Sequence, residues 1–207
     1  VVAEHVEEIR NTNFMQVLSE GYRAGFFRLA LFSGLTTGIL FAIGGFRAVY
    51  QAELGLPIIY FGIFFGVGRA LASLMLAYSG KIRFWFTAKR FYLFLFLAYT
   101  LMLVGLGLSS EPWVVVLLFI VSNAFHWGFS QLESGYMLDT IRGSKFKATL
   151  LSVSSQIDSL FSSVACYGMG LAIGYFSYKS GFLIMGACYV VFGVPLLIYL
   201  FRYKKAA

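Results

Sequence analysis

Polar and ionisable side chains follow one face of a long apolar stretch of this chain. Asn123, His126, Ser130 and Glu133 are spaced by three, four and three residues, which places all four on one face of a helix. Ionisable groups are rare inside a membrane and usually mark a pathway for a solute, ion or proton. For His126 we favour a neutral imidazole hydrogen-bonded between helices; the alternative is a proton relay that His126 forms together with Glu133. Asn123 suits a solute or an interhelical hydrogen bond equally well.

The next apolar stretch repeats this spacing. Its serines are Ser152, Ser155, Ser159 and Ser162, and Gln156 and Asp158 lie beside them. A short basic link, 139–147, reverses the chain between the two stretches. Two facing helices with polar stripes predict a wet cavity between them. We expect close packing from the serines, and from Gln156 a hydrogen bond to a solute or to another helix.

Two opposite charges fall deep within apolar stretches. Arg69 lies twelve residues after Pro57 and Asp158 twelve after Phe146. Each is therefore roughly 18 Å into a hydrocarbon core about 30 Å thick. A lone charge there costs at least about 2.5–3.5 kcal/mol, so we expect Arg69 and Asp158 to pair or to contact the same cavity. The pair is either static, or protonation of Asp158 releases Arg69 and shifts a conformational equilibrium.

The elements that must position these residues are six apolar stretches. The chain has 207 residues, of which 59% are hydrophobic and 12% charged, against about 25% charged residues in soluble domains. The stretches cover about 29–50, 57–79, 91–108, 113–138, 146–175 and 182–201. Their lengths are those of membrane-spanning helices and about twice those of β-barrel strands. The predicted fold is an all-α polytopic membrane protein with a six-helix domain over 28–205. Residues 1–27 are expected to be an amphipathic cytoplasmic connector, or alternatively a regulatory or partner-binding helix.

Catalytic and metal-binding patterns are missing from the sequence. His5 and His126 are the only histidines, and no P-loop occurs. Gly168, Gly170 and Gly174 lie in an apolar run, where helix packing is expected rather than a dinucleotide site. We therefore expect no enzyme activity, no cofactor and no metal.

Tyr50 and Gln51 close the first apolar stretch. They are candidates for an outer gate, and the alternative is a place in the interfacial aromatic belt.

Basic residues are unevenly distributed. Most of the 16 Lys and Arg residues lie near the two ends of the chain and in the links 80–90 and 139–147. Arg47 and Lys179 alone fall on the opposite side, which predicts that both ends are cytoplasmic, in a plasma (inner) membrane. The net charge of +7 then reflects topology and contact with anionic lipid headgroups rather than nucleic acid.

Polarity divides the six stretches into two groups of three. The third and sixth contain no ionisable residue and are expected to face lipid. The first, second, fourth and fifth contain polar or ionisable groups and are expected to face a cavity. A repeat of two cavity helices followed by one lipid-facing helix is what an inverted 3+3 repeat would give.

Two segments resemble the major facilitator superfamily of transporters. RAVYQAELGLPIIYFGIFFGVGR (47–69) is similar to the link between the seventh and eighth helices of that superfamily. YMLDTIRGSKFKATLLSVSSQIDSL (136–160) resembles its tenth-to-eleventh junction, with Ala148, Thr149, Leu151, Ser152 and Ser155 in the A-T-x-L-S-x-x-S pattern. The link after Gly80 departs from the superfamily's loop motif, because Lys81 follows the glycine and no acid precedes Arg90.

The resemblance implies the carboxy-terminal six-helix half of a twelve-helix transporter. It implies a substrate cavity between two halves, alternating access and, often, proton coupling. We expect a secondary active transporter of a small organic solute whose partner is a missing amino-terminal half, in keeping with a first residue of Val1 rather than Met. The alternatives are a half-size transporter that dimerises, or a membrane sensor or scaffold that does not transport.

Overall fold

The computed structural model describes residues 14–202, which form eight α-helices and one 3-10 turn, with no strand in this part of the chain. The elements are α2 (Phe14–Ala24), α3 (Phe26–Glu53), η1 (Ile58–Tyr60), α4 (Phe61–Ala77), α5 (Ser79–Trp85), α6 (Ala88–Leu108), α7 (Pro112–Thr140), α8 (Lys147–Tyr175) and α9 (Tyr178–Phe201). Six segments (α3, η1 with α4, α6, α7, α8 and α9) are long and apolar enough to cross a bilayer. The prediction of a polytopic, all-α integral membrane protein is confirmed.

The ends of the elements follow local turn chemistry. Gly25 adopts φ +76°, a left-handed conformation that ends α2 and lets α3 start in a new direction. Pro57 precedes η1, so the second span begins with a 3-10 turn. The basic link after Ala77 is partly helical, since 79–85 form α5.

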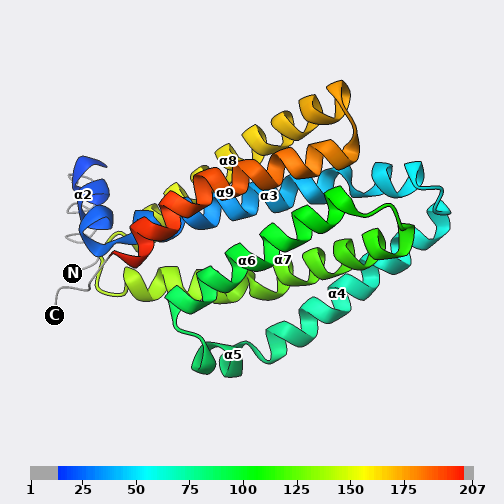
Figure 1. Cartoon of the computed structure of the whole chain (residues 1–207). Helices are drawn as coiled ribbons and strands as arrows, with labels where there is room; N and C mark the ends of the chain where they lie inside the picture. Colours follow the sequence, from blue (N-terminus) through cyan, green and yellow to red (C-terminus); the bar gives the residue numbers. More distant parts are fainter. Residues whose placement is uncertain (1–13, 203–207) are drawn as a thin grey trace.

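The spans pack in a fixed set of pairs. Helix α3 packs along α8 and also contacts α7 and α9, α4 packs along α7, and α6 packs along α9. Figure 1 shows α3, α8 and α9 side by side, with α4, α6 and α7 forming the other side of the bundle. Aromatic rings fill the interior between them, and the largest fully buried side chains include Phe32, Tyr92, Tyr99, Phe119, Phe182 and Tyr189.

Glycines permit the closest of these contacts. A Cβ placed on Gly38 would lie 2.7 Å from the carbonyl carbon and oxygen of Phe161, and one on Gly34 would lie 2.8 Å from Ile157 Cγ2. This small-residue pair therefore lets α3 approach α8 closely. In the second glycine cluster, a Cβ on Gly170 would lie 3.6 Å from Phe46 Cζ, an ordinary packing contact between α8 and α3. Nothing lies within 4 Å of a Cβ on Gly168 or Gly174, so these two glycines face away from the described neighbours.

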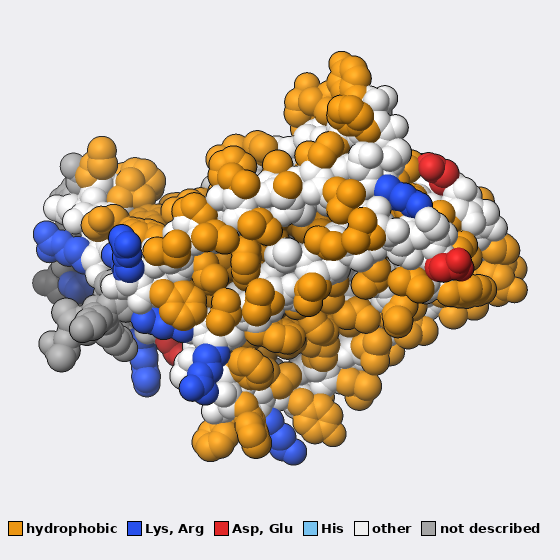
Figure 2. All heavy atoms as spheres, viewed as in Figure 1, with side chains coloured by type: hydrophobic (Ala, Val, Ile, Leu, Met, Phe, Trp, Pro, Cys, Tyr) orange, Lys and Arg blue, Asp and Glu red, His pale blue; other side chains and the backbone are white. Residues whose placement is uncertain are grey.

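Charge separates along the bundle axis. Figure 2 shows most of the visible Lys and Arg side chains at the end where α3 and α6 begin, and a largely hydrophobic surface between the two ends. Buried polar side chains, among them Ser33, Thr36 and Asn123, lie inside the bundle instead. The Thr36 hydroxyl is 3.0 Å from the Tyr189 hydroxyl, a contact that ties α3 to α9.

Candidate functional site

A cavity of 320 Å³ lies among α3, α7 and α8, and we call it the central cavity. Three of the ionisable residues selected from the sequence, His126, Glu133 and Asp158, line it. The first two come from α7 and the third from α8, so the two polar stripes meet across a shared space. The expectation of a polar cavity between these helices is met.

Glu133 and Asp158 face this cavity from different helices. Ser33 Oγ on α3 donates a hydrogen bond to Glu133 Oε2 at 3.4 Å. Asp158 Oδ1 is buried and has no hydrogen-bond partner among residues 14–202. It lies 3.3 Å from the position of a Cβ on Gly34, so the glycine makes room for this carboxyl.

The two carboxyl groups line the same cavity, so their negative charges can repel each other. Their repulsion falls when one of them binds a proton or when a cationic group lies between them. The two carboxyl groups can therefore bind a proton or a cationic group from the cavity and release it again.

A second cavity, of 380 Å³, continues from the first; we call it the aromatic cavity. Both are lined by Phe41, His126 and Trp127. The aromatic cavity also contains Asn123, whose Nδ2 donates to the carbonyl oxygen of Phe65 at 3.5 Å. The side chains along one face of α7 thus follow a single track through both cavities.

The imidazole of His126 contacts aromatic side chains rather than acidic ones. Its ring lies edge-on to Phe41, with 5.7 Å between centroids, and 4.9 Å from the ring of Trp127. Within residues 14–202 no hydrogen bond joins His126 to Glu133, and seven helical residues separate them by about 10 Å. The expected relay is therefore not a direct contact in this conformation and needs a mobile group between the two side chains.

Arg69 does not meet Asp158, so the expected ion pair is absent from the described chain. The Arg69 guanidinium lies 3.8 Å from the centroid of the Trp127 ring and 5.1 Å from that of Phe65. The physical reason is the helix packing: α4 packs along α7, whereas α8 packs along α3. Trp127 and Phe65 both line the aromatic cavity, so Arg69 lies behind its wall.

The remaining residues selected from the sequence lie outside both cavities. Tyr50 is 2% exposed and stacks on Tyr178 with ring centroids 5.0 Å apart. Gln51 is 1% exposed, and Gln156 is exposed on the outer side of α8. Tyr50 belongs to the core at the end of α3, and Gln51 is buried beside it.

Sequence reasoning missed residues that the structure brings into the two cavities. Ser33, Thr37 and Phe41 line them from α3, and Trp127 lies between them. The signal was present in the sequence, because 33, 37 and 41 are four residues apart and share one face of a helix. That face is short and only partly polar, so it is less conspicuous than the stripes on α7 and α8.

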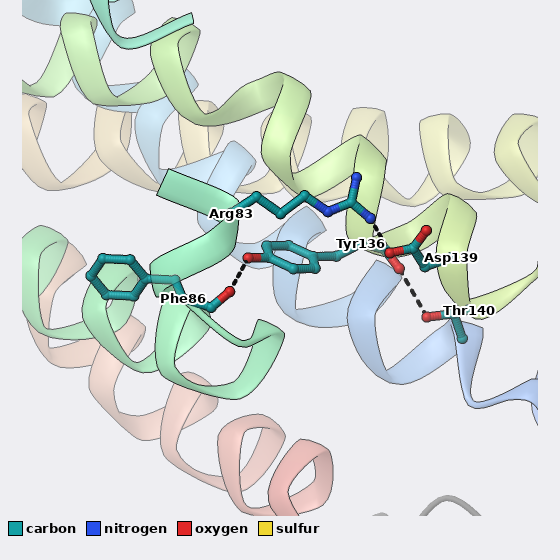
Figure 3. Close-up of polar contacts among 5 residues, drawn as sticks. All are labelled: Arg83, Phe86, Tyr136, Asp139 and Thr140. Carbon is teal, nitrogen blue, oxygen red and sulfur yellow. Dashed lines mark hydrogen bonds and ion pairs between the residues drawn. The ribbon is translucent and has the colours of Figure 1, made fainter. Parts of the chain in front are cut away.

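A separate polar cluster joins the basic link to the end of α7 (Figure 3). Arg83 on α5 forms an ion pair with Asp139, and the Tyr136 hydroxyl donates to the carbonyl oxygen of Phe86 at 2.6 Å. The Thr140 hydroxyl donates to the Tyr136 carbonyl oxygen at 2.9 Å. The basic link after Gly80 contains no acidic residue before Arg90, and Asp139 on α7 is the acidic partner of Arg83.

Comparisons with protein-family models, with curated protein sequences and with solved structures gave no match for this chain. Its function is therefore inferred from its own residues and their geometry.

Proposed function

We propose that this chain forms one half of the translocation pathway of a secondary active transporter. The solute is a small organic molecule, transport proceeds by alternating access, and protons supply the coupling. The likeness to the major facilitator superfamily at 47–69 and 136–160 favours this assignment.

The observation that carries the proposal is the pair of carboxyl groups in the central cavity. Glu133 and Asp158 come from two different spans and share one cavity with Ser33 and Thr37. A proton or a cationic solute group that binds between them changes the charge of that cavity. If the two helices move apart, this binding is lost, which links protonation to conformation.

The outer surface of α8 supports a partner that completes the cavity. Its exposed side chains include Ser152, Gln156, Ser159 and Ser163, together with apolar ones such as Leu160 and Val164. Within their spans, α6 and α9 expose apolar side chains such as Leu97, Leu101, Val191 and Phe192. Apolar surface suits lipid, whereas a polar surface favours protein or water. We infer that α8 faces a second six-helix half, which is either the amino-terminal half of a longer chain or a second copy.

Several of the helix pairs are related as an inverted 3+3 repeat would relate them, whereas the α8–α9 pair has no counterpart of similar extent between α4 and α6. Exchanging the first three spans with the last three converts the α3–α8 pair into the α7–α4 pair. The same exchange leaves the α6–α9 pair and the α3–α7 pair unchanged. This relationship supports a half built from two repeats. The basic end of the bundle supports a cytoplasmic position for the starts of α3 and α6, in a plasma membrane.

The first experiment is the mass of the full-length polypeptide in its native membrane. A mass near twice the 23.1 kDa of this chain supports a missing amino-terminal half. A mass near 23.1 kDa supports the homodimer, in which each cavity residue occurs twice.

Transport itself is tested in proteoliposomes that contain the full-length protein. An imposed pH gradient should drive uptake of at least one member of a panel of small organic solutes. Asp158→Asn should abolish this coupled uptake, whereas Glu53→Gln, an exposed acid at the end of α3, should not. Unchanged coupling in Asp158→Asn would contradict the proposed mechanism. No uptake of any solute by the unsubstituted protein would favour a sensor or scaffold.

A further inference from the structure

The central and aromatic cavities adjoin each other but differ in charge. Glu133 and Asp158 line the central cavity, and no Lys or Arg of the described chain lines it. Arg47 lines the aromatic cavity, where residues 14–202 place no acidic side chain. A solute that extends through both cavities therefore meets negative charge at one end and positive charge at the other.

The acidic end offers acceptors to a bound solute. Asp158 Oδ1 is buried and accepts no hydrogen bond from residues 14–202, and Glu133 accepts the 3.4 Å bond from Ser33. A buried acceptor without a donor costs free energy, which a donor on the solute would restore. An ammonium group suits this end of the pathway, because it supplies both the donors and the opposite charge.

The aromatic cavity suits a flat apolar group. Phe41 and Trp127 line both cavities, and Phe65 lines the aromatic cavity alone. Gly44 and Gly45 belong to the same wall, and nothing lies within 4 Å of a Cβ on either, so there is room beside the rings. Such a wall binds an aromatic group by removing its surface from water and by ring contacts.

Two positive charges determine which end of the solute enters which cavity. The Arg47 guanidinium lies 4.9 Å from the centroid of the Phe65 ring, and the Arg69 guanidinium lies 5.1 Å from the same centroid. Both charges repel an ammonium group from the aromatic cavity. The ammonium group is therefore directed to Glu133 and Asp158, and the apolar part of the solute to the rings.

The dimensions of the two cavities fit an elongated small molecule. Thr37 in the central cavity and Arg47 in the aromatic cavity are ten residues apart on α3, about 15 Å along the helix axis. The volumes of 320 and 380 Å³ lie in the range of small-molecule sites. We propose that the solute is a monocationic amine with an aromatic group, bound with its ammonium at Glu133 and Asp158 and its ring in the aromatic cavity. This inference rests on the proposed function, because it takes the two cavities as one wall of the solute pathway.

The test is equilibrium binding of small probes to the full-length protein in detergent, measured by titration calorimetry. Phenylbutylamine has its charge and its ring at opposite ends, phenylbutanol lacks the charge, phenylbutyrate has the opposite charge, and butylamine lacks the ring. We expect phenylbutylamine to bind at least about tenfold more tightly than each of the others. One hydrogen bond to a charged group, or one buried ring, accounts for such a factor.

A dication tests the orientation of the solute. Phenylbutylamine with an aminomethyl group added to the far end of its ring would place a second positive charge near Arg47. It should bind at least about tenfold more weakly than phenylbutylamine, and Arg47→Gln should reduce this difference. Equal binding of the two amines to the unsubstituted protein would contradict the orientation.

Variants separate the role of the acids from folding. Asp158→Asn should weaken binding of phenylbutylamine about tenfold and leave binding of phenylbutanol unchanged, because the amide keeps the shape of the side chain without its charge. Glu111→Gln alters an acid outside both cavities and should change neither affinity. The comparison of probes on the unsubstituted protein decides the matter even if Asp158→Asn does not fold.

Binding of phenylbutanol or phenylbutyrate as tight as that of phenylbutylamine would overturn the inference, as would equal losses in Asp158→Asn and Glu111→Gln. If the protein transports another solute but does not bind the amine, the proposed function stands and this inference fails. If the amine binds as expected but is not taken up in proteoliposomes, the site stands and the proposed transport function fails.

Discussion

Ser33 on α3 donates a hydrogen bond to Glu133 on α7, and the carboxyl group of Asp158 on α8 lies in the same cavity. Three spans therefore converge on one acidic site. A hydroxyl that donates to a carboxylate stabilises its charged form, and this bond is lost if α3 and α7 separate. The position of Ser33 thus connects the charge of Glu133 to the packing of two helices.

If Glu133 carries the coupled proton, Glu133→Gln should separate two kinds of transport. Uptake driven by a pH gradient should fall at least about a hundredfold, the lower end of what a positioned proton carrier contributes. Exchange of labelled for unlabelled solute at equal pH should persist, because it requires no net proton movement. Both rates are measured in proteoliposomes with the solute identified by the uptake panel.

The matched control is Glu111→Gln, which alters an exposed acid before α7 that is outside both span cavities. It should change neither rate. Loss of both uptake and exchange in Glu133→Gln would instead indicate a role in binding the solute or in folding.

Arg69 should be coupled energetically to Trp127 and not to Asp158. The guanidinium lies 3.8 Å from the Trp127 ring, and no ion pair joins it to the acid in the described chain. A double-mutant cycle of Arg69→Gln with Trp127→Leu should give a coupling of about 0.5–2 kcal/mol in the free energy of unfolding. The same cycle with Asp158→Asn should give less than about 0.5 kcal/mol.

Unfolding in detergent, titrated with a denaturing detergent, provides the free energies for both cycles. A larger coupling to Asp158 than to Trp127 would show that the ion pair predicted from depth alone forms in solution.

The sequence was sufficient to predict the spans and the polar face of α7. Long apolar runs and spacings of three and four residues determine these features locally, so Asn123, His126 and Glu133 could be placed on one helix face. The depth of a residue along its span could also be predicted from the sequence, but depth does not determine which helices are neighbours. Arg69 and Asp158 were matched in depth, yet their helices pack against different partners.

The sequence did not predict which side chains are exposed or which helices are neighbours. The serines of α8 have the spacing of a packing stripe, but Ser152, Ser155 and Ser159 are exposed. Ser33 reaches Glu133 because α3 also contacts α7, while Gly34 and Gly38 bring α8 with Asp158 close to the same helix. Such pairings depend on contacts between residues far apart in the chain, which periodicity within one helix does not encode.

The contacts that join α5 to the end of α7 should respond differently to salt. The Arg83–Asp139 pair is exposed, with side chains 42% and 58% accessible. Arg83→Gln should therefore cost less than about 1 kcal/mol in the free energy of unfolding, and high salt should remove most of this cost. Tyr136→Phe deletes a neutral hydrogen bond of 2.6 Å and should cost about 1 kcal/mol at any salt concentration.

Thermal unfolding of the two variants at low and high ionic strength checks this difference. A salt-independent cost for Arg83→Gln above 1 kcal/mol would mean that the pair is shielded from solvent in the intact protein.

Gly38→Ala should weaken the contact between α3 and α8. The added methyl group would lie 2.7 Å from the carbonyl carbon and oxygen of Phe161, and backbone atoms cannot move aside as the end of a side chain can. Overpacking of this kind costs about 1–3 kcal/mol, so the free energy of unfolding should fall by that amount. Because the contact also positions Asp158 next to α3, the rate of coupled uptake should fall as well.

Gly45→Ala is the matched control, since Gly45 lies on the same helix and nothing lies within 4 Å of its Cβ position. Alanine is the better helix former by about 0.5–1 kcal/mol, so this variant should be as stable as the unsubstituted protein or more so. Equal stability of the two variants would mean that α3 and α8 are farther apart in the membrane than in this structure. The acidic site would then have to be assembled in another conformation, because Asp158 reaches the central cavity only while α8 packs along α3.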